Sequence, residues 1–193
     1  MRIVAGSARG RPLKGPRSSA IRPTADRVRQ SIFNILGQWL DGQRVLDLYA
    51  GTGALGLEAV SRGAAAAVLV DQDKEAVSLC RENAKALGFE GQVRVVASPV
   101  ERAVEQLRRA GERFDAVFSD PPYAAGVTAR TLEQVEPLLL PGGVCVMEHD
   151  KREDVPEASG RLARADARAF GDTRVAFFRF LDPVEGGGDT APR

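Results

Sequence analysis

The stretch VLDLYAGTGALG, residues 45–56, decides the fold of this chain. Residues 45–49 are typical of a buried β-strand, and the glycines that follow have the spacing GxGxxG. A helix is expected from about residue 53 to residue 61. A strand, a glycine loop and a helix in this order begin a βαβ unit, in which a ligand binds where the strand ends and the helix begins.

The rest of the chain repeats this alternation. Strands are expected at 67–71, 93–97, 114–119 and 143–148, and helices at 74–87, 100–110 and 129–139. Upstream, Thr24 is expected to cap a helix whose apolar positions run to Trp39 and Leu40. Downstream, 161–167 and 173–181 are expected to pair as an antiparallel hairpin. The pattern predicts an α/β fold with a mostly parallel seven-stranded sheet, an antiparallel edge hairpin and helices on both faces.

Length and composition predict one globular domain. The chain has 193 residues, of which 44% are hydrophobic, and we place the domain at residues 21–182, after a basic hairpin at 1–20 with strands at 1–4 and 11–13. Residues 183–193 are expected to be a disordered tail. No apolar run has the length of a membrane span, and the basic first residues lack a signal-peptide core. We therefore expect a cytoplasmic monomer that has no contact with membranes.

Cysteine and histidine usage gives no sign of a metal site. Cys80 and Cys145 lie far apart, and His149 is the single histidine of the chain. Neither a disulfide framework nor a bound metal is expected from so few ligands.

Positive charge is concentrated at the N-terminus. Residues 1–30 carry eight arginines and lysines against one aspartate, a net charge of +7, whereas the other 163 residues carry −6. Such a segment is typical of a surface that binds nucleic-acid phosphates, and a solvated tail is the alternative. The candidate RNA-binding residues are Arg2, Arg9, Arg11, Lys14, Arg17, Arg22 and Arg27.

The glycine loop is compatible with two kinds of cofactor. Asp71 lies 20 residues after Gly51, as in proteins that bind NAD through its ribose. Asp47, however, precedes the loop by four residues and could face a cationic ligand. S-adenosylmethionine carries an ammonium group and a sulfonium and has no phosphate, so it fits a carboxylate at this place.

The turn Asp120-Pro121-Pro122-Tyr123 follows the strand expected at 114–119. The prolines have no amide hydrogen, so the carboxylate and the carbonyl groups of this turn can only accept hydrogen bonds. The exocyclic amine of a nucleobase is a suitable donor, and its ring can stack on a tyrosine.

With these motifs in this order, the chain resembles Rossmann-like class I methyltransferases that use S-adenosylmethionine to modify exocyclic amines. The basic N-terminus, Arg22-Pro23-Thr24, the segment 27–29 (RVR) and the segment 31–34 (SIFN) make it similar to the RsmD family. The resemblance implies methylation of guanine N2 in 16S ribosomal RNA, within the small subunit or an assembly intermediate, with S-adenosylhomocysteine as product.

The resemblance also implies roles for individual residues. Asp120 and the Pro121 carbonyl would accept from the guanine amine, in a turn completed by Pro122 and by Tyr123, which would stack on the base. Direct methyl transfer would need no covalent enzyme intermediate, and Asp120 could take the departing proton. Ser98 stands where an acidic residue or asparagine is commoner. The implied cofactor contacts are Asp47, Ala50, Gly51 and Gly53 for the methionine part, Asp71 for the ribose, and Gln72 and Ser98 for the adenine. Thr24, Arg27 and Arg29 could close over the cofactor or touch RNA phosphate.

Several other functions stay open at this point. An adenine-N6 methyltransferase acting on DNA or RNA would use the same turn, as would an enzyme that methylates a protein glutamine or a small amine. A non-catalytic RNA-binding assembly factor could keep the fold. An NAD-dependent oxidoreductase would explain the glycine loop but not the turn.

Overall fold

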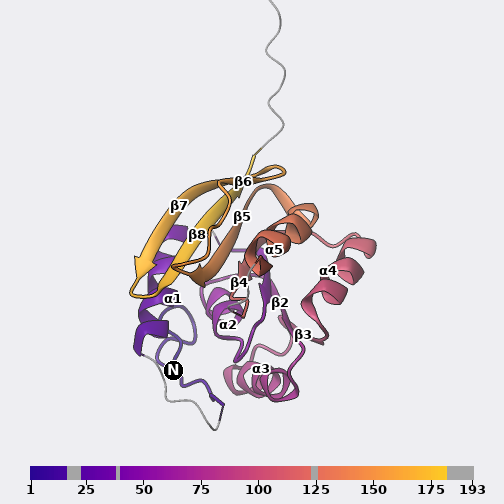
Figure 1. Cartoon of the computed structure of the whole chain (residues 1–193). Helices are drawn as coiled ribbons and strands as arrows, with labels where there is room; N and C mark the ends of the chain where they lie inside the picture. Colours follow the sequence, from indigo (N-terminus) through magenta and orange to yellow (C-terminus); the bar gives the residue numbers. More distant parts are fainter. Residues whose placement is uncertain (17–22, 38–39, 123–125, 182–193) are drawn as a thin grey trace, which may run out of the picture.

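The computed structural model describes residues 1–16, 23–37, 40–122 and 126–181. One sheet runs through this part of the chain, with helices on either side (Figure 1). The helices are α1 (Pro23–Leu36), α2 (Ala54–Ser61), α3 (Lys74–Leu87), α4 (Val100–Arg109) and α5 (Val127–Val135), with the short 3₁₀ helix η1 (Glu136–Leu138). The strands are β1 (Arg44–Leu48), β2 (Ala66–Asp71), β3 (Val93–Ala97), β4 (Phe114–Ser119), β5 (Leu139–Asp150), β6 (Ala158–Ser159), β7 (Leu162–Phe170) and β8 (Thr173–Phe180).

The strand order is β3-β2-β1-β4-β5-β8-β7-β6. The first five strands of this order pair in parallel, and β8, β7 and β6 pair antiparallel. The expected mostly parallel sheet with an antiparallel edge is therefore confirmed. The expected number of seven strands was one too low in the described chain, because β6 is a two-residue strand too short to show a periodic pattern.

Two hydrophobic clusters cover the two faces of the sheet. One contains buried residues of α1, α2 and α3, and the other contains those of α4, α5 and η1. The prediction that helices cover both faces of the sheet is confirmed. Burial on both faces explains why β1, with the sequence RVLDL, reads as a nearly continuous apolar run.

Several helix boundaries differ from the prediction, most of all those of α1 and α5. The helix α1 begins at Pro23, so Thr24 lies inside it and is not its N-cap. It ends at Leu36, because Gly37 adopts a left-handed backbone with φ of 61°; Trp39 lies outside the described residues. Pro137 cannot continue an α-helix, so α5 ends at Val135 and η1 leads into a strand that starts at Leu139.

The N-terminal segment, residues 1–16, packs onto α2 and α3. Ile3 and Leu13 are buried in the first core cluster. The two expected strands are reduced to one antiparallel bridge between Arg2 and Pro12. The reason lies in the hydrogen bonds, because the backbone N–H groups of Val4 and Ala5 are donated to the Glu58 carboxylate of α2, at 2.7 and 3.0 Å.

Asn83 of α3 joins the N-terminal segment to the glycine loop. Its side-chain amide donates to the carbonyl groups of Lys14, at 3.1 Å, and of Thr52, at 2.9 Å. Among the residues described, no helix has the length and apolar character needed to span a membrane.

Candidate active site

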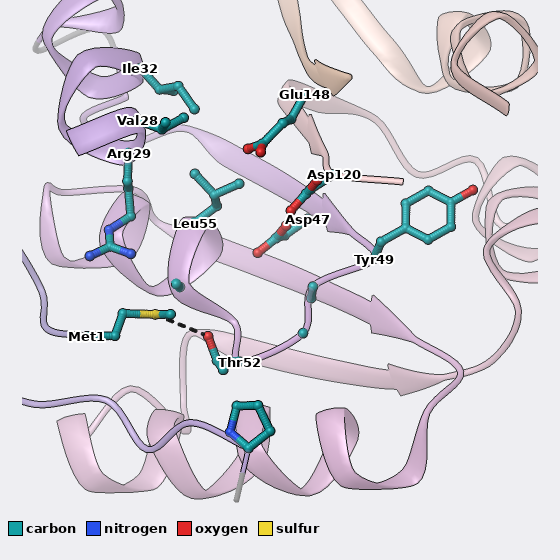
Figure 2. A pocket seen from close by; sticks show the side chains of 14 residues that line it. Met1, Val28, Arg29, Ile32, Asp47, Tyr49, Thr52, Leu55, Asp120 and Glu148 are labelled. Atoms are coloured by element: carbon teal, nitrogen blue, oxygen red, sulfur yellow. Dashed lines mark hydrogen bonds between the residues drawn. The ribbon is translucent and has the colours of Figure 1, made fainter. Parts of the chain in front are cut away.

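The candidate site lies at the carboxyl ends of the parallel strands. From β1 the chain first adds β2 and then β3 on one side of β1. It then crosses over and adds β4 on the other side of β1. In open α/β sheets, ligands bind at the carboxyl edge beside such a change of direction. A cavity of about 320 Å³, here called the main cavity, opens there. Figure 2 shows that its walls come from the N-terminal segment, α1, the glycine loop and the ends of β1, β4 and β5.

Asp47 of β1 is buried at the base of the main cavity, with 2% of its surface exposed. Its Oδ2 accepts a hydrogen bond of 2.8 Å from the backbone N–H of Gly56 in α2. Burial raises the pKa of Asp47 to about 8; the Gly56 hydrogen bond opposes this, and the charges of Asp120 and Asp71 add to it. A cationic group bound in the cavity would stabilise the ionised carboxylate.

Asp71 at the end of β2 holds the glycine loop. One carboxylate oxygen accepts from the backbone N–H of Gly51 and the other from that of Asp73, both at 2.9 Å. Asp71 is not among the residues that line the main cavity, whereas Ala50 and Gly51 are. Gly53 serves as the N-cap residue of α2 and does not line the cavity either.

The residues expected near the adenine lie outside the main cavity. Gln72 is exposed on the surface. Ser98 is buried, its backbone N–H donates to the Asp71 carbonyl at 3.0 Å, and its hydroxyl donates to the Pro99 carbonyl at 3.2 Å. The side chain of Thr24 lies outside the described part of the structure.

Asp120 follows β4 and lines the main cavity. Solvent still reaches it, but the surrounding protein removes enough water to raise its pKa to about 6, less than for Asp47. Pro121 is buried and Pro122 is exposed, while Tyr123 lies outside the described residues. The structure thus brings Asp47, Ala50, Gly51 and Asp120 together.

Glu148 is a cavity residue that the sequence analysis missed. It lies on β5, and its carboxylate faces the same open space as those of Asp47 and Asp120 (Figure 2). Burial raises the pKa of Glu148 to about 8, and the charge of Asp120 adds to the rise. The sequence held a signal for Glu148, since it is an acidic residue at the end of the strand expected at 143–148. The carboxyl ends of parallel strands meet at one edge of the sheet, so Glu148 could have been predicted to lie near Asp120.

Arg29 of α1, which the sequence offered as a residue that closes over the cofactor or touches RNA phosphate, lines the main cavity. The residue is 3% exposed, and its guanidinium donates to the Asp26 carboxylate at 2.8 Å and to the Arg2 carbonyl at 2.5 Å. Its Nε lies 3.6 Å from Glu58 and has no hydrogen-bond partner within the described chain. Arg29 therefore lines the main cavity with its charge already paired to Asp26.

The candidate RNA-binding residues fall into separate groups. Arg2, Arg9 and Arg27 line a second cavity of about 350 Å³, here called the arginine cavity, together with Asp26. The Arg11 guanidinium instead donates to the carbonyl groups of Ala86 and Leu87 at the end of α3. The Lys14 ammonium pairs with Glu82 of α3 at 2.8 Å. Arg17 and Arg22 lie outside the described residues.

The sequence matches a family model described as "Conserved hypothetical protein 95" over residues 1–179. It is 36% identical to "Putative rRNA methyltransferase YlbH" of Bacillus subtilis, over 93% of this chain and 98% of the relative. It is 40% identical to "Ribosomal RNA small subunit methyltransferase D" of Escherichia coli, over 70% of this chain and 67% of the relative. The solved structure of "Putative methyltransferase yhhF" from Escherichia coli superposes with a TM-score of 0.83 and 31% identity, covering 94% of this chain and 98% of the other.

Proposed function

This chain belongs to the Conserved hypothetical protein 95 family, and from that premise we propose that it transfers a methyl group from S-adenosylmethionine to the N2 amine of a guanine in small-subunit ribosomal RNA. The fold is that of class I methyltransferases. Similarity to two ribosomal RNA methyltransferases supports the RNA substrate. The acceptor turn at Asp120 supports methylation of an exocyclic amine, and the finer assignment, to guanine N2, rests on the resemblance to the RsmD family.

The observation that carries the proposal is a set of carboxylates facing one cavity beside the glycine loop. Burial raises the pKa of Asp47 and Glu148 to about 8, so this space favours a positively charged ligand. When bound, S-adenosylmethionine supplies a methyl group on a cationic sulfonium together with an ammonium group. These charges fit the carboxylates of the main cavity.

The same charges disfavour a dinucleotide. A pyrophosphate bound at the glycine loop would share the main cavity with Asp120, which is mostly ionised at neutral pH, and would give neither Asp120 nor Asp47 a counter-charge. The backbone N–H of Gly51, which could otherwise bind a phosphate, is already donated to Asp71. The NAD interpretation of the glycine loop therefore has little support in this site.

Asp120 and the Pro121 carbonyl orient the acceptor amine in this proposal. The lone pair of the guanine amine is delocalised into the ring, so the amine must be held with this lone pair directed at the methyl carbon. Positioning of this kind lowers barriers by about 7–11 kcal/mol at best. With a pKa of about 6, Asp120 is mostly ionised at neutral pH and is able to take the departing proton. Tyr123 is proposed as the stacking partner of the base.

For the cofactor we propose contacts of the methionine part with Asp47, Ala50, Gly51 and Gly53, and of the ribose with Asp71. The adenine would lie near Gln72 and Ser98. The RNA backbone would follow the positive N-terminus, where Arg2, Arg9 and Arg27 line the arginine cavity. Arg17 and Arg22 are proposed to bind the RNA backbone as well, because both are positively charged.

The proposal is tested by incubating the protein with S-adenosylmethionine and small-subunit ribosomal RNA, as free RNA and as assembled subunit, followed by mass spectrometry of the nucleosides. The expected product is N2-methylguanosine. Asp120→Ala should abolish transfer while S-adenosylmethionine still binds, as measured by calorimetry. N6-methyladenosine as the product would overturn the guanine assignment, and absence of any methylated nucleoside with both RNA forms would overturn the enzymatic function on this RNA.

A further inference from the structure

We propose that Glu148 selects guanine at this site by accepting a hydrogen bond from the N1–H of the base, while Asp120 accepts from the neighbouring N2 amine. The inference rests on the proposed function and deepens it, because it assigns the choice of base to a residue outside the acceptor turn.

The register of the sheet places the two carboxylates side by side. Ser119 of β4 is paired with Met147 of β5 in a parallel ladder, and Asp120 and Glu148 are the next residues on the two strands. Adjacent strands lie about 4.8 Å apart. The two side chains therefore start from neighbouring positions, and both line the main cavity (Figure 2).

Within the described residues, the Glu148 carboxylate makes no hydrogen bond or ion pair. The charged residues that line the main cavity with it are Asp47 from β1, Asp120 after β4 and Arg29 from α1. Arg29 is engaged with Asp26 and with the Arg2 carbonyl, so it is not used to neutralise Glu148. A largely buried, unpaired carboxylate beside a second one is costly unless a ligand supplies donors.

Guanine supplies donors in the required arrangement. Its N1–H and its N2 amine are adjacent on one edge of the base, so two neighbouring carboxylates can each accept from one of them. Adenine presents its N6 amine next to N1, which is an acceptor. With the cationic S-adenosylmethionine bound in the same cavity, Glu148 is held ionised, and its carboxylate would face the lone pair of N1. Enzymes that take a base out of the stack read this edge through hydrogen bonds. Glu148 would therefore favour guanine even though Asp120 can accept from either amine.

The test compares guanine with 2-aminopurine at the methylated position of the RNA, mapped first with the wild-type protein. 2-Aminopurine keeps the 2-amine but has an acceptor at N1. The wild-type protein should methylate guanine with a kcat/KM about 10- to 100-fold higher than 2-aminopurine, which corresponds to one hydrogen bond to a charged group. Glu148→Gln should lose most of this preference, because its amide can donate to the N1 acceptor.

Two controls separate this role from a structural one. Glu133→Gln removes the same charge from an exposed position on α5 and should keep the wild-type preference. Glu148→Gln should also keep the wild-type unfolding temperature to within a few degrees and bind 2-aminopurine RNA at least as well as the wild type, as followed by base fluorescence without methyl transfer. If Glu148→Gln still prefers guanine by the wild-type ratio, the inference is wrong while the proposed function stands. If the wild-type protein forms no N2-methylguanosine, the proposed function itself has failed.

Discussion

Asp71 at the end of β2 accepts a 2.9 Å hydrogen bond from the backbone N–H of Gly51, and so ties the second strand of the fold to the glycine loop that follows the first. Its other carboxylate oxygen accepts from the backbone N–H of Asp73 at 2.9 Å. The residue proposed to contact the cofactor ribose thus also sets the shape of the loop. A change at Asp71 should affect stability and cofactor binding together.

Asp71→Asn is expected to lower the free energy of unfolding by about 1–3 kcal/mol, because one of the two backbone donors then loses its acceptor. Affinity for S-adenosylmethionine should fall as well. Urea unfolding and calorimetric titration measure the two effects. The control is Asp73→Asn, since Asp73 caps α3 through a 2.9 Å bond to Ala76 and asparagine caps equally well. Equal losses in both variants would argue against a special role of Asp71.

Two glycines of the GxGxxG motif, Gly51 and Gly56, should respond differently to alanine. A Cβ at Gly56 would lie 2.2 Å from Leu69 Cδ2 and 3.2 Å from Asp47 Oδ2, so Gly56→Ala should destabilise the fold by about 1–3 kcal/mol. A Cβ at Gly51 would meet no atom within 4 Å, and the left-handed φ of 57° costs about 1–2 kcal/mol.

The decisive measurement is the affinity for S-adenosylmethionine. Gly51 lines the main cavity, so the added Cβ of Gly51→Ala should occupy ligand space and weaken binding by more than its loss of stability suggests. Thermal unfolding with and without the cofactor distinguishes the two variants. Unchanged cofactor affinity in folded Gly51→Ala would place the ligand away from this loop.

Ligand-free stability should fall as the pH rises from about 4 to about 8. The pKa of Asp47 and of Glu148 is raised to about 8 and that of Asp120 to about 6, so the folded state binds more protons than the unfolded state in this window. The stability present at low pH is therefore lost as the pH rises through these values. Asp47→Asn should make the decrease shallower, as urea unfolding at a series of pH values would reveal. A decrease of the same steepness in the variant would contradict the raised pKa of Asp47.

Binding of S-adenosylmethionine should release protons at pH 7, because a cation in the main cavity favours the ionised carboxylates. Affinity should accordingly increase between pH 6 and pH 8. Calorimetry in two buffers of different ionisation enthalpy counts the protons released. Proton uptake, or an affinity that decreases over this range, would contradict a carboxylate-lined cofactor site.

The arginine cavity should account for part of the salt dependence of RNA binding. Changing Arg2, Arg9 and Arg27 together to glutamine should weaken binding and reduce the slope of log affinity against log salt by about 0.7–0.9 for each phosphate that is no longer neutralised. Arg11→Gln is the comparison, because the Arg11 guanidinium is bound to carbonyl groups of α3. It should reduce stability and leave the salt slope nearly unchanged. A slope reduced as much by Arg11→Gln as by the triple change would show that the two groups are equivalent.

Glu58 should prove essential for the position of the N-terminal segment. It is fully buried, accepts from the backbone of Val4 and Ala5, and pairs with Arg62 at 2.7 Å. Glu58→Ala would leave buried donors unpaired, and losses of about 3–5 kcal/mol are typical when one partner of a buried ion pair is removed. Chemical unfolding measures the loss, and Glu75→Ala on the exposed start of α3 serves as the comparison. A loss below about 1 kcal/mol, the size of one ordinary hydrogen bond, would show that the segment is held by its buried apolar residues and by its hydrogen bonds to Ser61 and Asn83.

Local patterns in the sequence were sufficient for the alternation of strands and helices. The apolar run of β1 and the glycine loop after it each depend on neighbouring residues, so periodicity and glycine spacing report them directly. The same holds for the acceptor turn at Asp120, whose chemistry follows from its own residue types. Asp47 was predicted from its position at the end of a strand, and it lies in the main cavity.

Only the tertiary structure decided which of the charged residues share a site. Glu148 joins Asp120 because β4 and β5 pair in parallel, although the two residues lie 28 positions apart in the sequence. Arg11 and Lys14 turn to α3, whereas Arg2, Arg9 and Arg27 gather in one cavity, and a count of charges along the chain cannot separate these groups. Side-chain chemistry and local conformation are properties of short segments. The position of a carboxylate or a guanidinium relative to its partner depends on strand register and on the packing of distant elements.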